Sequence, residues 1–94
     1  MSNNSNDTIF IGKKPLMTYV TSTIVQLATK PNVTIKERGL TTAIAIDVAQ
    51  VVLKKTKPAF TIDNVLIGSE SLVSSDGKNR DVSTIEISIK RTAA

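Results

Sequence analysis

Two adjacent lysines, Lys13 and Lys14, form the short motif of this sequence whose chemistry most needs an explanation. They lie in Gly12-Lys13-Lys14-Pro15, between an apolar stretch at 9–11 and a helix that we expect to open at the proline. A helix start carries partial positive charge, so two ammonium groups oppose it unless a ligand brings negative charge. A phosphate backbone is such a ligand. On these four residues alone, a solvated lysine pair remains the stronger interpretation.

Two further basic groups stand at predicted turns. Arg38-Gly39 ends a strand next to a helix start, where the glycine allows a positive φ or a close backbone approach. Lys78 and Arg80 lie on a polar hairpin tip beside two aspartates, so the local charge nearly cancels. That tip is either a solvated loop or an arm whose basic residues enter a minor groove.

A third basic group, Lys54, Lys55 and Lys57, falls at the end of a predicted helix. Cations are stabilising there because the last carbonyls carry partial negative charge. We therefore prefer a structural interpretation of these three lysines.

Enzyme chemistry finds little support in the composition. The 94 residues include no cysteine and no histidine, which removes thiolate nucleophiles, the commonest general base and the usual zinc ligands. The eight acidic residues show no DxD or ExxE spacing, and the segment at 12–14 lacks the glycine spacing of a P-loop. We expect no enzyme, no metal and no cofactor.

The charge balance favours a polyanionic partner. Twelve Lys and Arg against eight Asp and Glu give a net charge of +4, and three aromatics leave little for base stacking. Residues 1–7 are polar without an apolar core, and nowhere is there an apolar run long enough to span a bilayer. We expect a cytosolic protein with a disordered lead-in at 1–7, one domain at 8–91 and a tail at 92–94.

Hydrophobic periodicity predicts an α+β fold of order βαβαββ, a two-layer sandwich with two helices on one face of a mixed four-stranded sheet. In the first helix β-branched residues favour a strand, but a single apolar helical stripe decides for a helix. The predicted elements are strand Thr8–Ile11, helix Pro15–Lys30, strand Val33–Lys36, helix Thr41–Lys57, strand-like Phe60–Val73 broken at Gly68, and strand Val82–Lys90.

The second helix has more apolar surface than one face of a sheet can cover. Its polar positions form one narrow stripe, and small alanines separate the large aliphatic residues. We therefore expect its surplus face to meet a second subunit.

Several motifs, in order and at matching separations from Thr8 to Arg91, closely resemble archaeal Alba chromatin proteins. These motifs are Ile11-Gly12-Lys13-Lys14-Pro15 with Met17 and Tyr19-Val20, Ile35-Lys36-x-Arg38-Gly39, Ala43 with Ile46-Asp47, Gly68-Ser69, Ser75-Asp76-Gly77, and Val82-Ser83-Thr84-Ile85-Glu86-Ile87.

The resemblance implies a dimer that coats and compacts double-stranded DNA in the nucleoid, with little sequence preference, and also binds RNA. Lys13 and Lys14 would lie centrally on the binding surface. One of them, with Lys13 favoured, would be acetylated to weaken binding, which implies an acetyltransferase and a deacetylase as partners. Arg38-Gly39 would contact the backbone, and the hairpins with Lys78 and Arg80 would reach along the minor groove.

The same resemblance implies that the dimer forms through the second helix and the C-terminal strands, in agreement with the surplus apolar face. The expected interface residues are Ile44, Val48, Val51, Val52, Ile85 and Ile87.

Three departures from the family pattern stand out. Leu40 replaces a second basic residue after Arg38-Gly39, Thr56 replaces a phenylalanine that joins dimer to dimer on DNA, and the segment 57–63 is about one residue short. Two alternatives therefore stay open: a protein that mainly binds RNA, and an adaptor that forms a heterodimer with another Alba-like chain and binds little itself.

Overall fold

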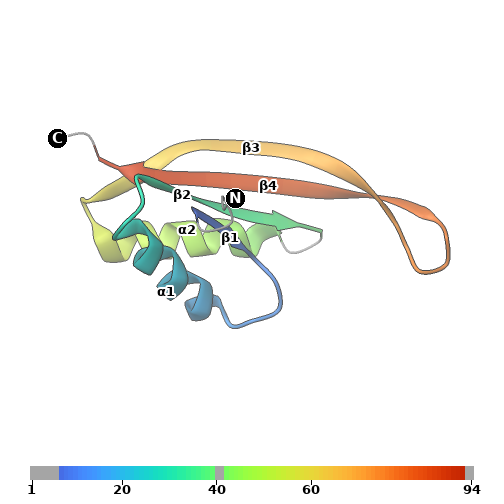
Figure 1. Cartoon of the computed structure of the whole chain (residues 1–94), viewed down its shortest axis with the longest axis horizontal. Helices are drawn as coiled ribbons and strands as arrows, with labels where there is room; N and C mark the ends of the chain where they lie inside the picture. Colours follow the sequence, from blue (N-terminus) through green and yellow to red (C-terminus); the bar gives the residue numbers. More distant parts are fainter. Residues whose placement is uncertain (1–6, 40–41, 93–94) are drawn as a thin grey trace.

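The structure, a computed structural model, describes residues 7–39 and 42–92. The predicted element order is confirmed (Figure 1). The elements are β1 Thr8–Phe10, α1 Leu16–Leu27, β2 Asn32–Arg38, α2 Thr42–Thr56, β3 Phe60–Val73 and β4 Asn79–Arg91.

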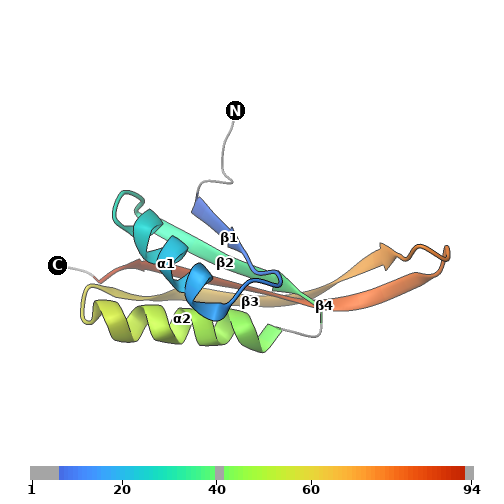
Figure 2. The same ribbon diagram turned by 90° about the horizontal axis from the view of Figure 1, so that it is seen from below.

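The four strands form one mixed sheet in the order β1-β2-β4-β3. β1 runs parallel to β2, and the other two pairings are antiparallel. Both helices pack on the same face of this sheet, which confirms the expected two-layer α+β fold (Figure 2). The β3–β4 hairpin continues well beyond the helices, so the domain is elongated, 50 × 29 × 21 Å (Figure 1).

Tertiary packing holds α1 in a helix despite its β-branched residues. Tyr19, Val20, Thr23 and Leu27 lie on one helical face and are buried against the sheet. The hydroxyl of Thr23 donates to the carbonyl oxygen of Tyr19, 2.8 Å away, so this buried polar atom is satisfied. Pro15 precedes the helix in an extended conformation, so the helix begins at Leu16, one residue later than the sequence suggested, and it ends at Leu27 rather than Lys30.

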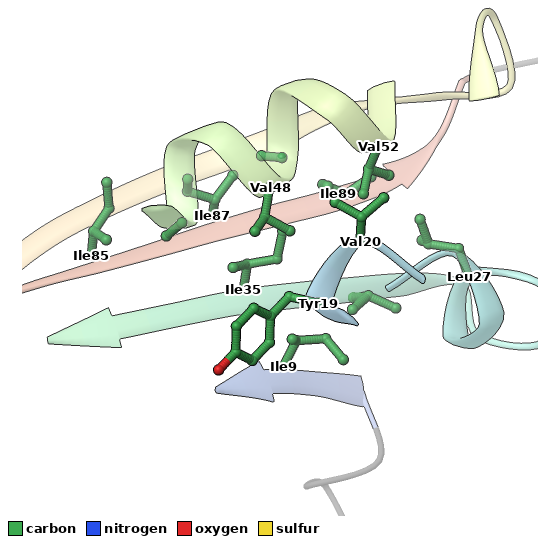
Figure 3. Close-up of a cluster of buried hydrophobic side chains, with 13 residues drawn as sticks. Ile9, Tyr19, Val20, Leu27, Ile35, Val48, Val52, Ile85, Ile87 and Ile89 are labelled. Atoms are coloured by element: carbon green, nitrogen blue, oxygen red, sulfur yellow. The ribbon is translucent and has the colours of Figure 1, made fainter. Parts of the chain in front are cut away.

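The core is aliphatic and lies between the helices and the sheet (Figure 3). Ile85, Ile87 and Ile89 point toward the helices, as their alternation predicted, and they meet Val48 and Val52 of α2 (Figure 3). At roughly 25 cal/mol for each Å² of apolar surface, this burial is the main stabilising term.

The first turn of α2 is joined to β2 by Glu37. This carboxylate is buried, and its Oε1 accepts the backbone N–H of Ala45 at 3.0 Å. Negative charge is favourable at a helix N-terminus, so Glu37 supplies it from the neighbouring strand. The sequence suggested a strand that ends at Lys36 and a turn at Glu37-Arg38-Gly39, which is wrong for Glu37 and Arg38 because β2 continues to Arg38.

The hairpin strands are longer than the sequence indicated. β3 is not broken at Gly68, and its register shift lies between Ile62 and Asn64. β4 begins at Asn79 rather than Val82, so Arg80 belongs to a strand and pairs with Leu72. Cross-strand pairing extends the ladder into residues whose side chains carry no hydrophobic alternation, which is why periodicity missed them.

Candidate nucleic-acid interface

The loop that carries Lys13 and Lys14 is held in place by the hydroxyl of Tyr19. The Tyr19 hydroxyl accepts backbone N–H groups from Gly12 at 2.8 Å and from Lys14 at 2.9 Å. The ring of Tyr19 is buried in the core, so the loop is tied to the hydrophobic core of the domain (Figure 3). A side chain at Gly12 would come within 3.3 Å of that hydroxyl, which explains the glycine.

Both lysine side chains of this loop face solvent. Neither takes part in any of the three ion pairs found among the described residues. The fixed backbone therefore presents two ammonium groups close to the N-terminus of α1, a combination that attracts anions.

Arg38 lies at the same end of the sheet as this loop. Phe10 pairs with Lys36 in β2, and the N–H of Ile11 still donates to the carbonyl of Lys36, so the chain leaves β1 beside the last residues of β2. Gly39 follows with a φ of +100°, as the sequence interpretation allowed, and its N–H donates to Ser83. Lys13, Lys14 and Arg38 are thus brought to one end of the domain.

Arg38 is engaged by an acidic residue that the sequence interpretation did not connect with it. Its guanidinium donates to the Glu70 carboxylate at 3.2 Å, across the open face of the sheet. Both side chains are about half exposed, so the pair is weak, on the order of 0–1 kcal/mol. β4 lies between Arg38 in β2 and Glu70 in β3, and the sequence alone does not reveal the strand register that brings these two side chains together.

A shallow groove of about 520 Å³ surrounds this pair on the open face of the sheet. Lys36 lies in it, with its ammonium 3.8 Å from Glu86 and 5.8 Å from the centre of the Phe10 ring. Two basic residues, Lys36 and Arg38, and three acidic residues, Glu37, Glu70 and Glu86, therefore line the groove, so it carries no surplus of positive charge.

The two hairpin residues lie farther out. Lys78 is at the tip and Arg80 follows in β4, both exposed. Thr84 pairs with Arg38, so at about 3.4 Å per residue Arg80 and Lys78 lie roughly 14 and 20 Å beyond it along the hairpin. The structure does not bring them into contact with the lysine loop, and they could reach only a ligand that extends along the arm.

The tip itself is a compact turn around Asp76-Gly77, a dipeptide typical of hairpin turns. Gly77 has a φ of +83°, and the Asp76 carboxylate accepts hydrogen bonds from the Ser74 hydroxyl and the Lys78 N–H. These bonds, the one from Ser74 first, lower the pKa of Asp76 below its ordinary value of 3.8.

The expected dimer residues divide into two groups. Val48, Val52, Ile85 and Ile87 are buried within the subunit core, so they have little surface left for a partner. Ile44 and Val51 are half-buried. More exposed apolar residues, which the expected set did not include, are Val65 and Ile67 of β3 and Ile46 of α2, of which 50%, 82% and 45% are accessible.

Thr56 and Leu40 are two of the positions at which this sequence departs from the pattern it resembles, and the structure describes only the first of them. Thr56 ends α2 with its hydroxyl donating to the carbonyl of Val52 at 2.8 Å, which gives this helix end a satisfied polar residue. Leu40 and Thr41, like the lead-in at 1–6, lie outside the described residues.

The described residues contain neither a membrane-spanning helix nor a cluster of potential metal ligands. Across residues 7–39 and 42–92, no helix has the length and apolar character needed to cross a membrane. Within the same ranges, His, Cys, Asp and Glu residues form no group of three or more that could hold a metal ion.

The fold and the site define a small two-layer domain that presents a basic loop and a long hairpin from one end of its sheet. The sequence model of the Alba family matches residues 7–69. The chain belongs to the Alba family, which confirms the resemblance seen in the sequence.

Relatives with known names agree over most of their length. The chain is 59% identical over 95 residues to the DNA/RNA-binding protein Alba of Nitrosopumilus maritimus, with 100% of both chains covered. It is 39% identical over 90 residues to the protein of the same name from Methanocella arvoryzae, covering 95% of this chain and 94% of that one.

Solved structures show the same fold. Alba from Thermoplasma volcanium superposes with a TM-score of 0.82 at 35% identity, covering 89% of this chain and 99% of that one. ALBA1 from Trypanosoma brucei, at 14% identity, gives a TM-score of 0.76 over 96% of this chain and 73% of that one, and is similar in fold alone.

Proposed function

We propose that this chain is a nucleic-acid-binding protein that coats and compacts double-stranded DNA as a dimer, and that it also binds RNA. The observation that carries the proposal is the pair of exposed lysines, Lys13 and Lys14, on a loop that Tyr19 holds in place. The relatives named DNA/RNA-binding protein Alba support the same conclusion.

Binding depends mainly on the phosphate backbone. Lys13 and Lys14 supply charge at the loop, and Arg38 adds a planar donor at the same end of the sheet once it leaves Glu70. Aromatic stacking contributes little, because Tyr19 is buried and Phe10 already lies against Lys36. The expected result is affinity with little sequence preference.

The hairpin extends the contact along the duplex. The β3–β4 hairpin, which carries Arg80 in β4 and Lys78 at its tip, projects past the body of the domain (Figure 1). An arm of this reach suits a groove that runs on from the phosphates at the lysine loop. The neighbouring Asp76 and Asp81 limit its net charge, so the arm adds grip more than affinity.

The dimer is proposed to form through the apolar surface that the subunit leaves open on β3 and α2. Val65 and Ile67 face the helix side of the sheet, opposite Ile87 and Ile85 of β4, but are not covered. With Ile46 and the half-buried Ile44, they offer a patch that a second copy could cover. Two lysine loops would then act on one nucleic acid.

Acetylation of Lys13 or Lys14 offers a way to regulate binding. Both side chains face solvent and are accessible to an acetyltransferase and a deacetylase. Acetylation removes the ammonium charge and with it the attraction to one phosphate, which lowers affinity.

The test is a salt titration of binding to DNA and RNA duplexes of matched sequence. The wild type should bind with log K falling steeply with log salt. Lys13→Gln/Lys14→Gln should flatten that slope by about 0.9 for each phosphate that the variant no longer neutralises. Lys13→Arg/Lys14→Arg keeps the charge and should retain the slope. Unchanged binding by the glutamine variant would contradict the site.

The same titration separates the two nucleic acids. Affinity for the DNA duplex equal to or above that for RNA supports a chromatin role, and a clear preference for RNA supports the alternative of an RNA-binding protein. Binding of neither duplex would remove both functions.

A further inference from the structure

Half of the basic residues of this chain lie at the end of the domain away from the lysine loop. They are Lys30, Lys54, Lys55, Lys57, Lys90 and Arg91. Only two carboxylates, Asp7 and Asp63, fall at this end, whereas the six remaining cations of the chain are matched by its six other carboxylates. The net charge of +4 therefore resides at the end opposite the proposed interface.

Strand pairing places these residues together. Asn32, which follows the Lys30-Pro31 turn, pairs with Lys90, and Phe60 pairs with Arg91. The N–H of Thr92 donates to Ala59 at 2.9 Å, just after Lys57. The C-terminal ends of α1, α2 and β4 thus lie at the same end of the domain in both views (Figures 1 and 2). Six residues of β2 separate this end from Arg38, about 20 Å.

Most of these cations have no acidic partner. Asp63 pairs with Lys90 at 3.4 Å, but Lys30, Lys54, Lys55, Lys57 and Arg91 take part in none of the ion pairs among the described residues. Lys54, Lys55 and Lys57 are exposed. We call Lys30, Lys54, Lys55, Lys57 and Arg91 the distal basic patch.

Helix stabilisation accounts for only part of this charge. Arg91 reaches the carbonyl of Leu27 at the end of α1, at 3.5 Å, and two of the lysines lie in the last turn of α2. Each helix C-terminus carries about half a negative charge, so two of them balance about one cation of the five. Arg91 also lies over the ring of Phe60, 5.2 Å from its centre, so the charge that no ion pair of the described residues balances rests mainly on the four lysines.

We propose that the distal basic patch is a second phosphate-binding surface, with which the chain holds a second nucleic-acid segment while the lysine loop holds the first. The inference rests on the proposed function. A duplex carries one negative charge per about 1.7 Å of its axis and so matches a set of cationic side chains at one end of the domain that take part in no ion pair among the described residues. The distance of about 20 Å from Arg38 keeps the two surfaces separate.

The test uses full-length protein and two duplex DNAs of unrelated sequence. One duplex is biotinylated, fixed to beads and saturated with protein; after washing, a fluorescent second duplex is added at low salt and its capture is measured. The variants are Lys54→Gln/Lys55→Gln/Lys57→Gln and the charge-preserving Lys54→Arg/Lys55→Arg/Lys57→Arg, each checked by thermal unfolding.

We expect the wild type and the arginine variant to capture the second duplex. The glutamine variant should retain the first duplex and capture about tenfold less of the second, because three ammonium groups no longer neutralise its phosphates. Capture by the glutamine variant equal to wild type, or an equal reduction in the arginine variant, would overturn the inference. A wild type that holds the first duplex but no second also overturns it, whereas failure to hold the first overturns the proposed function.

Discussion

The hydroxyl of Tyr19 lies 2.9 Å from the backbone nitrogen of Lys14 and accepts its hydrogen bond, so a core aromatic residue sets the shape of the most exposed basic loop. A second bond from Gly12 to the same oxygen closes the loop on both sides of Lys13. The phenolic oxygen therefore links the packing of α1 to the position of the charges at the surface.

Tyr19→Phe should loosen this loop without unfolding the domain. The ring stays in the core, but two N–H groups lose their acceptor, at a cost of about 1 kcal/mol in the free energy of unfolding. Duplex affinity should fall roughly threefold, because binding must then order the loop. Amide exchange at Gly12 and Lys14 should accelerate. Thr23→Val, which removes a buried hydroxyl one turn away, should leave those two amides protected.

Glu70→Gln should strengthen nucleic-acid binding. It releases Arg38 from its carboxylate partner and removes a negative charge that would face the phosphates. Because the pair is half exposed, the gain should be modest, up to about fivefold at low salt, and should shrink as salt rises.

A double-mutant cycle identifies the origin of that gain. In an Arg38→Gln background, Glu70→Gln should help less than in the wild type if the effect acts through Arg38. An identical gain in both backgrounds would mean that Glu70 acts only through the general charge of the surface.

The sequence predicted the order and type of all six elements because each has a local signal: prolines beside both helices, one apolar stripe in α1, alternation in β4, and Asp76-Gly77 at the tip. It could not give the ends of strands whose pairing depends on a neighbour. β2 therefore takes in Glu37 and Arg38, and β4 takes in Arg80, although the sequence alone places all three in turns.

For the candidate site, the sequence identified the basic residues but not their partners. Lys13, Lys14 and Arg38 stand out because they are basic. Nothing in the sequence marks the Tyr19 hydroxyl as an acceptor for the loop, and Glu70 is far from Arg38 along the chain. The expected interface residues stay a prediction, and the sequence could not tell which of them are buried within the subunit, because an apolar residue on α2 looks the same whether it faces its own sheet or another subunit.

The hairpin tip should show a measurable titration. Hydrogen bonds from Ser74 and Lys78 stabilise the charged form of Asp76 and lower its pKa below 3.8. Because the folded-state pKa is depressed, this contribution to stability is present above about pH 3.8 and is lost as the pH falls through the folded-state pKa. NMR titration of the Asp76 carboxyl carbon should give a midpoint below 3.8, and Ser74→Ala should move it upward.

Glu37→Ala should destabilise the domain strongly, because Glu37 is buried. It removes a buried acceptor of the Ala45 N–H and a favourable charge at the start of α2, at about 2 kcal/mol in urea unfolding. Glu86→Gln is the matched control, since its half-exposed pair with Lys36 should contribute less than about 1 kcal/mol. Equal destabilisation by the two variants would show that Glu37 has no special role.

Ile67→Asp should separate the proposed dimer. Ile67 is the most exposed large apolar residue described, at 82%, and lies beside Val65 on the uncovered helix side of β3. An aspartate there would be buried without a partner in the dimer but would stay solvated in the monomer, so dissociation should be favoured with little loss of subunit stability. Light scattering should report a mass near 10.1 kDa for the variant and about twice that for the wild type.

Val73→Asp, an equally polar change near the outer end of the same strand, should remain dimeric. A wild type that is monomeric at working concentrations, or an Ile67→Asp variant that keeps its dimer mass, would place the subunit contact elsewhere and leave this apolar patch without its proposed occupant.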